Sequence, residues 1–147
     1  MRRIFNTPND FSLTILRLAL GCVFFAHGAQ KVLGWWGGHG LNTTFNLFTH
    51  QMNVPAPFAG LAIAAEFLGG LGLVVGLLGR VAALGIACNM VVAVRTVHWP
   101  NGFFMNWEGH QSGEGFEFHI LAIAIALAIL IKGSGAISFD RLFTKSR

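Results

Sequence analysis

The side chains of this sequence that could do chemistry are one carboxylate and several bases within apolar segments. Glu66 lies about halfway along the apolar run Ala56–Leu78. That run is long enough to cross a bilayer, because a spanning helix needs roughly 20 mostly apolar residues. A carboxylate at bilayer depth costs on the order of 2.5–3.5 kcal/mol by insertion scales. We therefore expect Glu66 to face the protein interior, where it is either paired with a partner or protonated.

The polar side chains that could accompany Glu66 belong to the other apolar segments. A rise of about 1.5 Å per residue, with alternating helix directions, puts Asn89 near the midplane with Glu66 and the other groups further out. The candidate ligand-binding residues are His27, Lys31, Glu66, Asn89, Arg95, His98, Glu117 and His119. Glu66, His27 and Arg95 are the candidates for catalysis, with Arg95 orienting Glu66 or polarising a carbonyl group. The inner half offers mainly Arg17, and this one-sidedness indicates a site, since a structural bundle gains nothing from costly groups gathered at one level.

Several chemistries could use this set of residues. A quinone site needs an apolar slot open to lipid, hydrogen-bonding groups at the carbonyls and a carboxylate that passes protons, and the set provides these groups. Imidazoles and carboxylates also suit zinc, copper or iron, but no HxxxH or HExxH motif puts two ligands on one helix, so we assign no metal ligands. No CxxCH motif is present, and b-type haem ligation cannot be inferred from spacing. A proton relay remains open, as does a structural network in which Arg95 neutralises Glu66 or Glu117.

Two long basic side chains within the spans, Lys31 and Arg17, could extend toward a membrane surface. Lys31 lies four residues after His27 on the same helix face, and its long side chain is expected to snorkel outward while His27 stays inside. Arg17 is close enough to the inner surface to snorkel, or to pair with Asp140 in the tail, which would be a structural role.

The elements that must position the candidate residues are membrane-spanning helices. The 147 residues are 54% hydrophobic and 11% charged, with a mean hydropathy of +0.61, whereas a soluble domain is about 25% charged. The predicted spans are Phe11–Lys31, Ala56–Leu78, Val81–His98 and Phe116–Ile131. Leu41–Met52 has the spacing of a short amphipathic interfacial helix between the first two spans. We predict an all-α, polytopic membrane protein whose four transmembrane helices form one antiparallel bundle, a single domain over residues 1–147.

Small residues predict how closely the spans pack. Gly21 and Gly28 lie a heptad apart in the first span, and either could let a neighbouring helix approach. The second span carries a stripe of small residues at Ala62, Ala65, Gly69, Gly72 and Gly76. Glu66 borders this stripe, so it is expected to point into the bundle.

The basic residues outside the spans predict the orientation. They gather at the amino terminus, the turn at Gly79-Arg80 and the tail, whereas the opposite loops hold only Lys31. These residues are Arg2, Arg3, Arg80, Lys132, Arg141, Lys145 and Arg147. The positive-inside rule puts both termini in the cytoplasm. The net charge of +4 forms no clustered basic face, so no nucleic-acid partner is expected.

Taken together, these segments resemble the DoxX family of small membrane proteins with four spanning helices. The matching segments, in the family's order, are Arg17–Gly21, His27–Gly34, Glu66–Gly70, Gly76–Arg80, His98–Phe104, Gly115–Glu117 and Gly133–Asp140. The resemblance implies a multi-pass protein of the bacterial inner membrane. Some members are similar to the quinone-linked subunit of thiosulfate:quinone oxidoreductase, and others are associated with oxidative or thiol stress or with metal handling. The positions of this sequence that match the family's motifs are His27, Lys31, Glu66, His98 and Glu117.

The residues and the resemblance together predict a membrane oxidoreductase-type subunit that binds quinone or a similar redox ligand. Its expected partners are the lipid bilayer and a redox protein, and self-association is compatible with the sequence. Two alternatives stay open. One is a non-catalytic membrane binding or assembly protein with an internal salt-bridge network, and the other is a protein that binds copper, zinc or haem. The sequence does not decide whether the chain is itself an enzyme.

Overall fold

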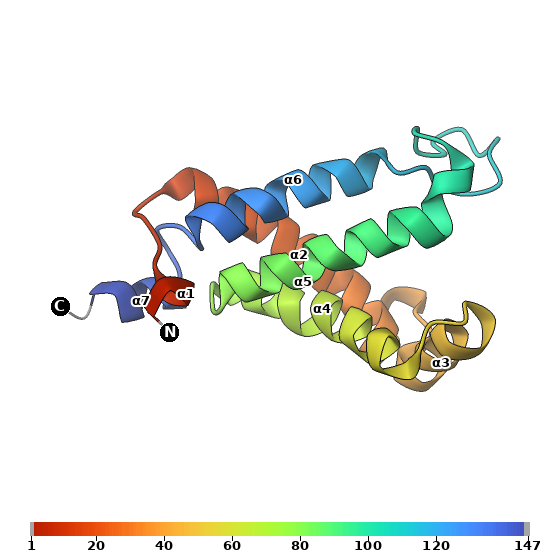
Figure 1. Cartoon of the computed structure of the whole chain (residues 1–147), viewed down its shortest axis with the longest axis horizontal. Helices are drawn as coiled ribbons and strands as arrows, with labels where there is room; N and C mark the ends of the chain where they lie inside the picture. Colours follow the sequence, from red (N-terminus) through yellow and green to blue (C-terminus); the bar gives the residue numbers. More distant parts are fainter. Residues whose placement is uncertain (1, 146–147) are drawn as a thin grey trace.

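The chain is described by a computed structural model that covers residues 2–145. All regular secondary structure in this range is helical (Figure 1). Three helices are long and apolar enough to cross a membrane, at Phe11–Leu33, Ala56–Val75 and Gly79–Asn101. These three agree with the first three predicted spans, so the all-α membrane class is confirmed.

Glycine and proline residues lie at or near most ends of the main helices. The main helices are α2 (Phe11–Leu33), α4 (Ala56–Val75), α5 (Gly79–Ala93) and α6 (Glu117–Lys132). The α5 helix continues through a π-helical turn, Val94–His98, and a 3-10 turn, Trp99–Asn101. The expected interfacial helix is α3 (Gly40–Asn46), extended by a π-helical turn at Leu47–Gln51. A single 3-10 turn, Trp35–Gly37, separates α2 from α3.

Both ends of α2 are set by local chemistry. The carboxylate of Asp10 caps its first turn and accepts a hydrogen bond from the backbone N–H of Ser12 at 2.8 Å. This satisfies a backbone donor that has no partner inside the helix. At the other end Gly34 has φ 71°, a left-handed conformation that glycine adopts without a steric penalty. Asp10 is therefore the N-cap of α2.

The closest helix–helix contact joins α2 to α4, and it depends on glycine. A Cβ atom at Gly28 would overlap the backbone of Phe67, and one at Gly21 would lie 2.8 Å from the backbone nitrogen of Val74. Gly70 on α4 meets the backbone of Phe25 in the same way. Close approach through small residues is the usual packing mode of membrane helices, and it holds the polar residues of α2 and α4 at a fixed separation.

The four main helices enclose one core. α2 packs against α4, α4 against α5, α5 against α6, and α6 against α2. The buried core residues include Leu20, Phe24, Leu73, Ile86 and Ala126. Both chain ends lie at one end of the molecule, which we call the inner end, while α3 and the loop between α5 and α6 lie at the other, the outer end (Figure 1).

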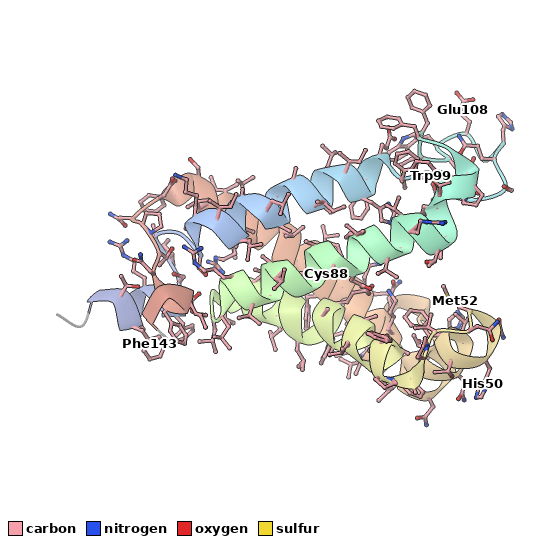
Figure 2. The ribbon with its side chains drawn as sticks, in the orientation of Figure 1. His50, Met52, Cys88, Trp99, Glu108 and Phe143 are labelled. Atoms are coloured by element: carbon pink, nitrogen blue, oxygen red, sulfur yellow. The ribbon has the colours of Figure 1, made fainter. Side chains whose placement is uncertain are left out.

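Two short helices flank the main bundle. They are α1 (Arg2–Phe5) and α7 (Phe139–Lys145), which contact each other at the inner end. The rings of Phe5 and Phe143 lie 5.2 Å apart, and Figure 2 labels Phe143 beside the inner end of the bundle. Of the basic residues used to predict orientation, Arg147 lies outside the described residues.

Candidate functional site

The outer half of the bundle contains a buried carboxylate whose two oxygens both have partners. The side chain of Glu66 on α4 is 9% exposed. Its Oε2 forms an ion pair with Nζ of Lys31 on α2. Its Oε1 accepts a hydrogen bond of 2.9 Å from Nδ2 of Asn89 on α5. The carboxylate thus faces the interior, as expected, and joins three helices.

The cation beside Glu66 differs from the one expected. Lys31 does not snorkel outward but turns to Glu66 and remains 25% exposed. Arg95 is exposed and forms no ion pair among residues 2–145. The reason is helical geometry: Arg95 follows Asn89 by six residues, about 240° around a helix, so the two cannot face the same neighbour. The structure therefore corrects the pairing of Arg95 with Glu66 or Glu117.

His27 lies one turn before Lys31 on α2 and is exposed. It follows Phe24 by three residues, about 60° around the helix, and the Phe24 ring stacks on Phe118 of α6 with centroids 6.4 Å apart. His27 is therefore on the side of α2 that faces α6. Its ring has no hydrogen bond with any other described side chain or backbone group. An imidazole at this depth gains free energy from a ligand that offers a hydrogen-bonding group.

Two further histidines pair with each other on α5 and α6. The ring centroids of His98 and His119 lie 4.0 Å apart. Nδ1 of His98 lies 2.8 Å from the carbonyl oxygen of Glu114, so Nδ1 carries the proton and donates it. His119 is only 6% exposed, and its Nδ1 is enclosed with no hydrogen-bond partner among the described residues. Such a group costs about 1–3 kcal/mol.

Glu117 serves the outer loop and not the Glu66 cluster. Its Oε1 accepts hydrogen bonds from the backbone N–H of Met105 at 3.0 Å and from Nε1 of Trp107 at 3.3 Å. These contacts fold the segment between α5 and α6 back onto the start of α6. Glu117 and His119 are two residues apart, about 200° around the helix, which explains why the structure does not bring both to one site.

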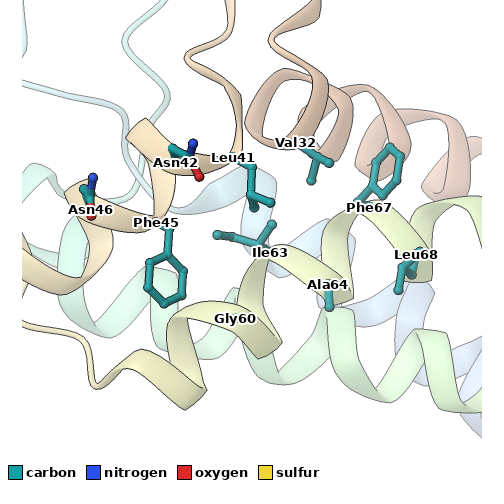
Figure 3. A pocket seen from close by; sticks show the side chains of 10 residues that line it. All are labelled: Val32, Leu41, Asn42, Phe45, Asn46, Gly60, Ile63, Ala64, Phe67 and Leu68. Carbon is teal, nitrogen blue, oxygen red and sulfur yellow. The ribbon is translucent and has the colours of Figure 1, made fainter.

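A surface groove of the molecule is lined by other residues than those of this cluster. It has a volume of about 550 Å³ and lies between the end of α2, α3 and α4 (Figure 3). Its lining is Val32, Leu41, Asn42, Phe45, Asn46, Gly60, Ile63, Ala64, Phe67 and Leu68. The lining contains none of the candidate site residues. Within residues 2–145, no group of three or more His, Cys, Asp or Glu side chains is arranged to hold a metal ion.

A second polar cluster, at the inner end, contradicts the predicted one-sidedness. Arg17 on α2 is 1% exposed. Its Nε donates to the carbonyl oxygen of Ser134 at 2.9 Å. Its two terminal nitrogens donate to backbone carbonyls of α4 and of the segment before α7: Leu73, Val74 at 2.9 Å, and Ile137 at 2.6 Å. Arg17 therefore does not snorkel to the surface.

Asp140 completes this inner cluster from the other side. It is 1% exposed and accepts hydrogen bonds from the backbone N–H groups of Leu78 at 2.8 Å and Gly79 at 3.0 Å, and from Oγ of Ser134 at 2.5 Å. Arg17 and Asp140 form no direct ion pair with each other; both bind the same segment. The signal in the sequence was the set of matching segments Arg17–Gly21, Gly76–Arg80 and Gly133–Asp140, which meet here.

Comparison with known proteins identifies the family. The DoxX family model matches residues 12–99. This chain belongs to the DoxX family. The match contains the α2, α4 and α5 residues of the outer cluster, while His119 and Asp140 lie beyond it.

Two curated relatives of this DoxX protein cover most of its length. A protein of Bacillus subtilis (strain 168) named "Putative oxidoreductase CatD" is 27% identical over 142 residues, which is 97% of this chain and 94% of the relative. An uncharacterized protein of Haemophilus influenzae is 26% identical over 136 residues, which is 91% of this chain and 84% of the relative. No solved structure matches the chain.

Proposed function

We propose that this DoxX protein is a membrane oxidoreductase subunit that binds a quinone or a similar lipid-soluble redox ligand at the outer site of His27, Lys31, Glu66 and Asn89. The observation that carries the proposal is a partly buried ion pair, Lys31 with Glu66, one turn from a histidine that is exposed at membrane depth and has no described hydrogen-bond partner. The name of the Bacillus subtilis relative supports the oxidoreductase class.

The hydrogen-bond donors of the residues at this site suit the carbonyl oxygens of a quinone head group. Lys31 has three N–H donors, and Glu66 occupies one of them. The remaining donors and the ring of His27 can hold a carbonyl oxygen. A bound quinone supplies two-electron, two-proton redox chemistry, and the electrons would be exchanged with a separate redox partner protein. Glu66 holds the Lys31 ammonium toward the interior and can take up a proton that Lys31 releases.

The proposal includes a four-span arrangement in the bacterial inner membrane, with antiparallel helices and both termini in the cytoplasm. The α6 helix has 16 residues, about 24 Å of rise, against about 30 Å of hydrocarbon. Apart from Lys132 in its last turn, its exposed side chains, among them Ile120, Leu121 and Leu127, are apolar. A short span of this kind is accommodated by local thinning of the bilayer. The basic residues gather at the inner end of the bundle, and by the positive-inside rule this supports a cytoplasmic location of both termini.

The test is quinone binding by protein purified in mild detergent. Extraction followed by chromatography measures bound quinone, and titration with a short-chain quinone measures affinity. We expect His27→Ala and Glu66→Gln to lower that affinity, whereas His50→Ala leaves it unchanged. His50, which is labelled in Figure 2, is exposed on the π-helical turn after α3 and is not one of the proposed site residues. Absence of both native quinone and quinone binding in the wild-type protein would rule the proposal out.

A second candidate function is a non-catalytic assembly protein. The observation in its favour is that both oxygens of Glu66 already have partners, as they would in a structural network. In that case Glu66→Gln lowers thermal stability and leaves both quinone affinity and partner activity unchanged. Elemental analysis of the same preparation tests the metal-binding alternative.

A further inference from the structure

His119 is a buried histidine of the outer half that the proposed site does not use. Its Nδ1 is enclosed and has no hydrogen-bond partner among the described residues. Its Nε2 also has no described partner, but Nε2 is not among the enclosed atoms, so the small exposed fraction of the ring includes this nitrogen. A buried imidazole without any hydrogen bond is rare in proteins, and here Nε2 is the ring nitrogen that is left accessible to a partner.

The neighbours of His119 fix its ring in place. On one side the ring lies against His98, whose own Nδ1–H is held by the carbonyl of Glu114. On the other side Phe118 meets it edge to face, with centroids 5.5 Å apart. Nε2 is therefore a preorganised group, since its direction is set before any ligand arrives.

One aromatic contact relates His119 to the proposed site. Phe118, which precedes His119 on α6, stacks on Phe24 of α2. His27 follows Phe24 by three residues on α2. The two histidines thus lie within one helical turn of the same contact, on helices that face each other. His27 and Lys31 are on the α2 side, and His119 is on the α6 side.

We propose that the outer site holds a ring with oxygen atoms on two opposite edges, one bound by His27 and Lys31 and the other by Nε2–H of His119. This inference rests on the proposed function and adds a selectivity-determining residue to it. A 1,4-quinone places its two carbonyl oxygens on opposite edges of one ring. His119 therefore selects two-oxygen rings over rings that carry one oxygen.

The experiment compares two probes on the full-length protein in detergent. One probe is a 1,4-benzoquinone with a single isoprene unit, and the other is a matched ring that lacks one of the two oxygens. The wild-type protein is expected to bind the two-oxygen probe about threefold to tenfold more tightly, the range that one hydrogen bond provides. His119→Phe keeps an aromatic ring and removes both nitrogens, so the preference disappears while affinity for the one-oxygen probe stays the same.

The controls separate this role from a purely structural one. His119→Gln retains an N–H donor and is expected to restore part of the preference, which also covers the case in which His119→Phe does not fold. His110→Phe, an exposed loop position, leaves both affinities unchanged. Equal weakening of both probes in the His119 variants, or no preference in the wild-type protein, would overturn the inference while leaving the proposed function intact. If the wild-type protein binds neither probe, both fail.

Discussion

The inner and outer polar clusters of this protein differ in how many of their polar groups have hydrogen-bond partners. At the inner end, Arg17 and Asp140 are each 1% exposed, and their hydrogen bonds go to backbone groups and to one serine hydroxyl. At the outer end the Lys31–Glu66 pair is partly exposed, His27 has no described partner, and Nδ1 of His119 is enclosed without one. Both clusters join segments far apart in the sequence.

This difference distinguishes charged residues that stabilise the fold from charged residues that are available to bind a ligand. A charge taken out of water must have its hydrogen bonds replaced, and the inner cluster replaces them with fixed backbone groups of α4, the turn before α5 and the segment before α7. Such a cluster holds the inner ends of the helices together and has no capacity for a ligand. The outer cluster retains unused donors beside an ion pair, which suits it to an exchangeable partner.

The largest effect is expected from Asp140→Ala at the inner end. The substitution leaves two backbone N–H groups and the Ser134 hydroxyl without their acceptor, so we expect the free energy of unfolding to fall by about 3–5 kcal/mol. Denaturant titration in detergent measures it, with quinone affinity of the folded fraction unchanged.

Asp10→Ala provides the matched control for this change. It removes a carboxylate from a helix N-cap near the same end and is expected to cost about 0.5–2 kcal/mol. If Asp140→Ala costs no more than this control, the inner cluster is not what holds that end together.

A smaller effect is expected from breaking the outer ion pair. Lys31→Met leaves Glu66 with Asn89 alone, and Glu66→Gln leaves the ammonium without its counterion. Because Lys31 is 25% exposed, each should cost about 1–3 kcal/mol, less than a fully buried pair. In a double-mutant cycle the combined variant should cost less than the sum by about 0.5–3 kcal/mol. Strict additivity would show that the two side chains do not interact.

The parts of this structure that could be predicted from sequence are those with local causes. The spans follow from apolar runs and their glycine and proline boundaries, and the common depth of Glu66 and Asn89 follows from rise per residue. Rotation about the helix axis does not follow, because it depends on which neighbours pack where. For this reason depth alone selected Arg95 as the partner of Glu66, where the structure has Lys31.

The inner cluster shows a second limit of sequence reasoning. Arg17 was expected to snorkel or to pair with Asp140, yet it binds carbonyl groups, and Asp140 binds amides. Backbone groups have no signature in the sequence, so a charged residue that they satisfy looks unpartnered. The folding of the tail into α7, which brings these groups together, is a consequence of the same long-range contacts.

Asn89→Leu tests how much the third member of the outer cluster contributes. It removes one hydrogen bond to Glu66 and puts an apolar side chain of similar size in its place. Because Lys31 still holds the carboxylate, we expect a loss of about 1–2 kcal/mol in the free energy of unfolding. Thermal melts of Asn89→Leu and of Asn42→Leu, which replaces an exposed α3 amide that has no described side-chain hydrogen bond, measure the difference. Equal losses would mean that the bond to Glu66 adds nothing of its own.

The smallest change in stability is expected from His27→Ala. This variant best tests whether the outer cluster differs in function from the inner one. An exposed side chain without hydrogen bonds contributes little to folding, so the free energy of unfolding should change by no more than about 0.5 kcal/mol, as it should for Val23→Ala one turn earlier on α2. Quinone affinity should nevertheless fall by about threefold to tenfold, because one hydrogen bond to the ligand is lost. Thermal melts and quinone titrations on the same preparations measure both quantities. If His27→Ala instead destabilises the fold as much as Glu66→Gln and leaves affinity unchanged, the outer cluster is of the same structural kind as the inner one.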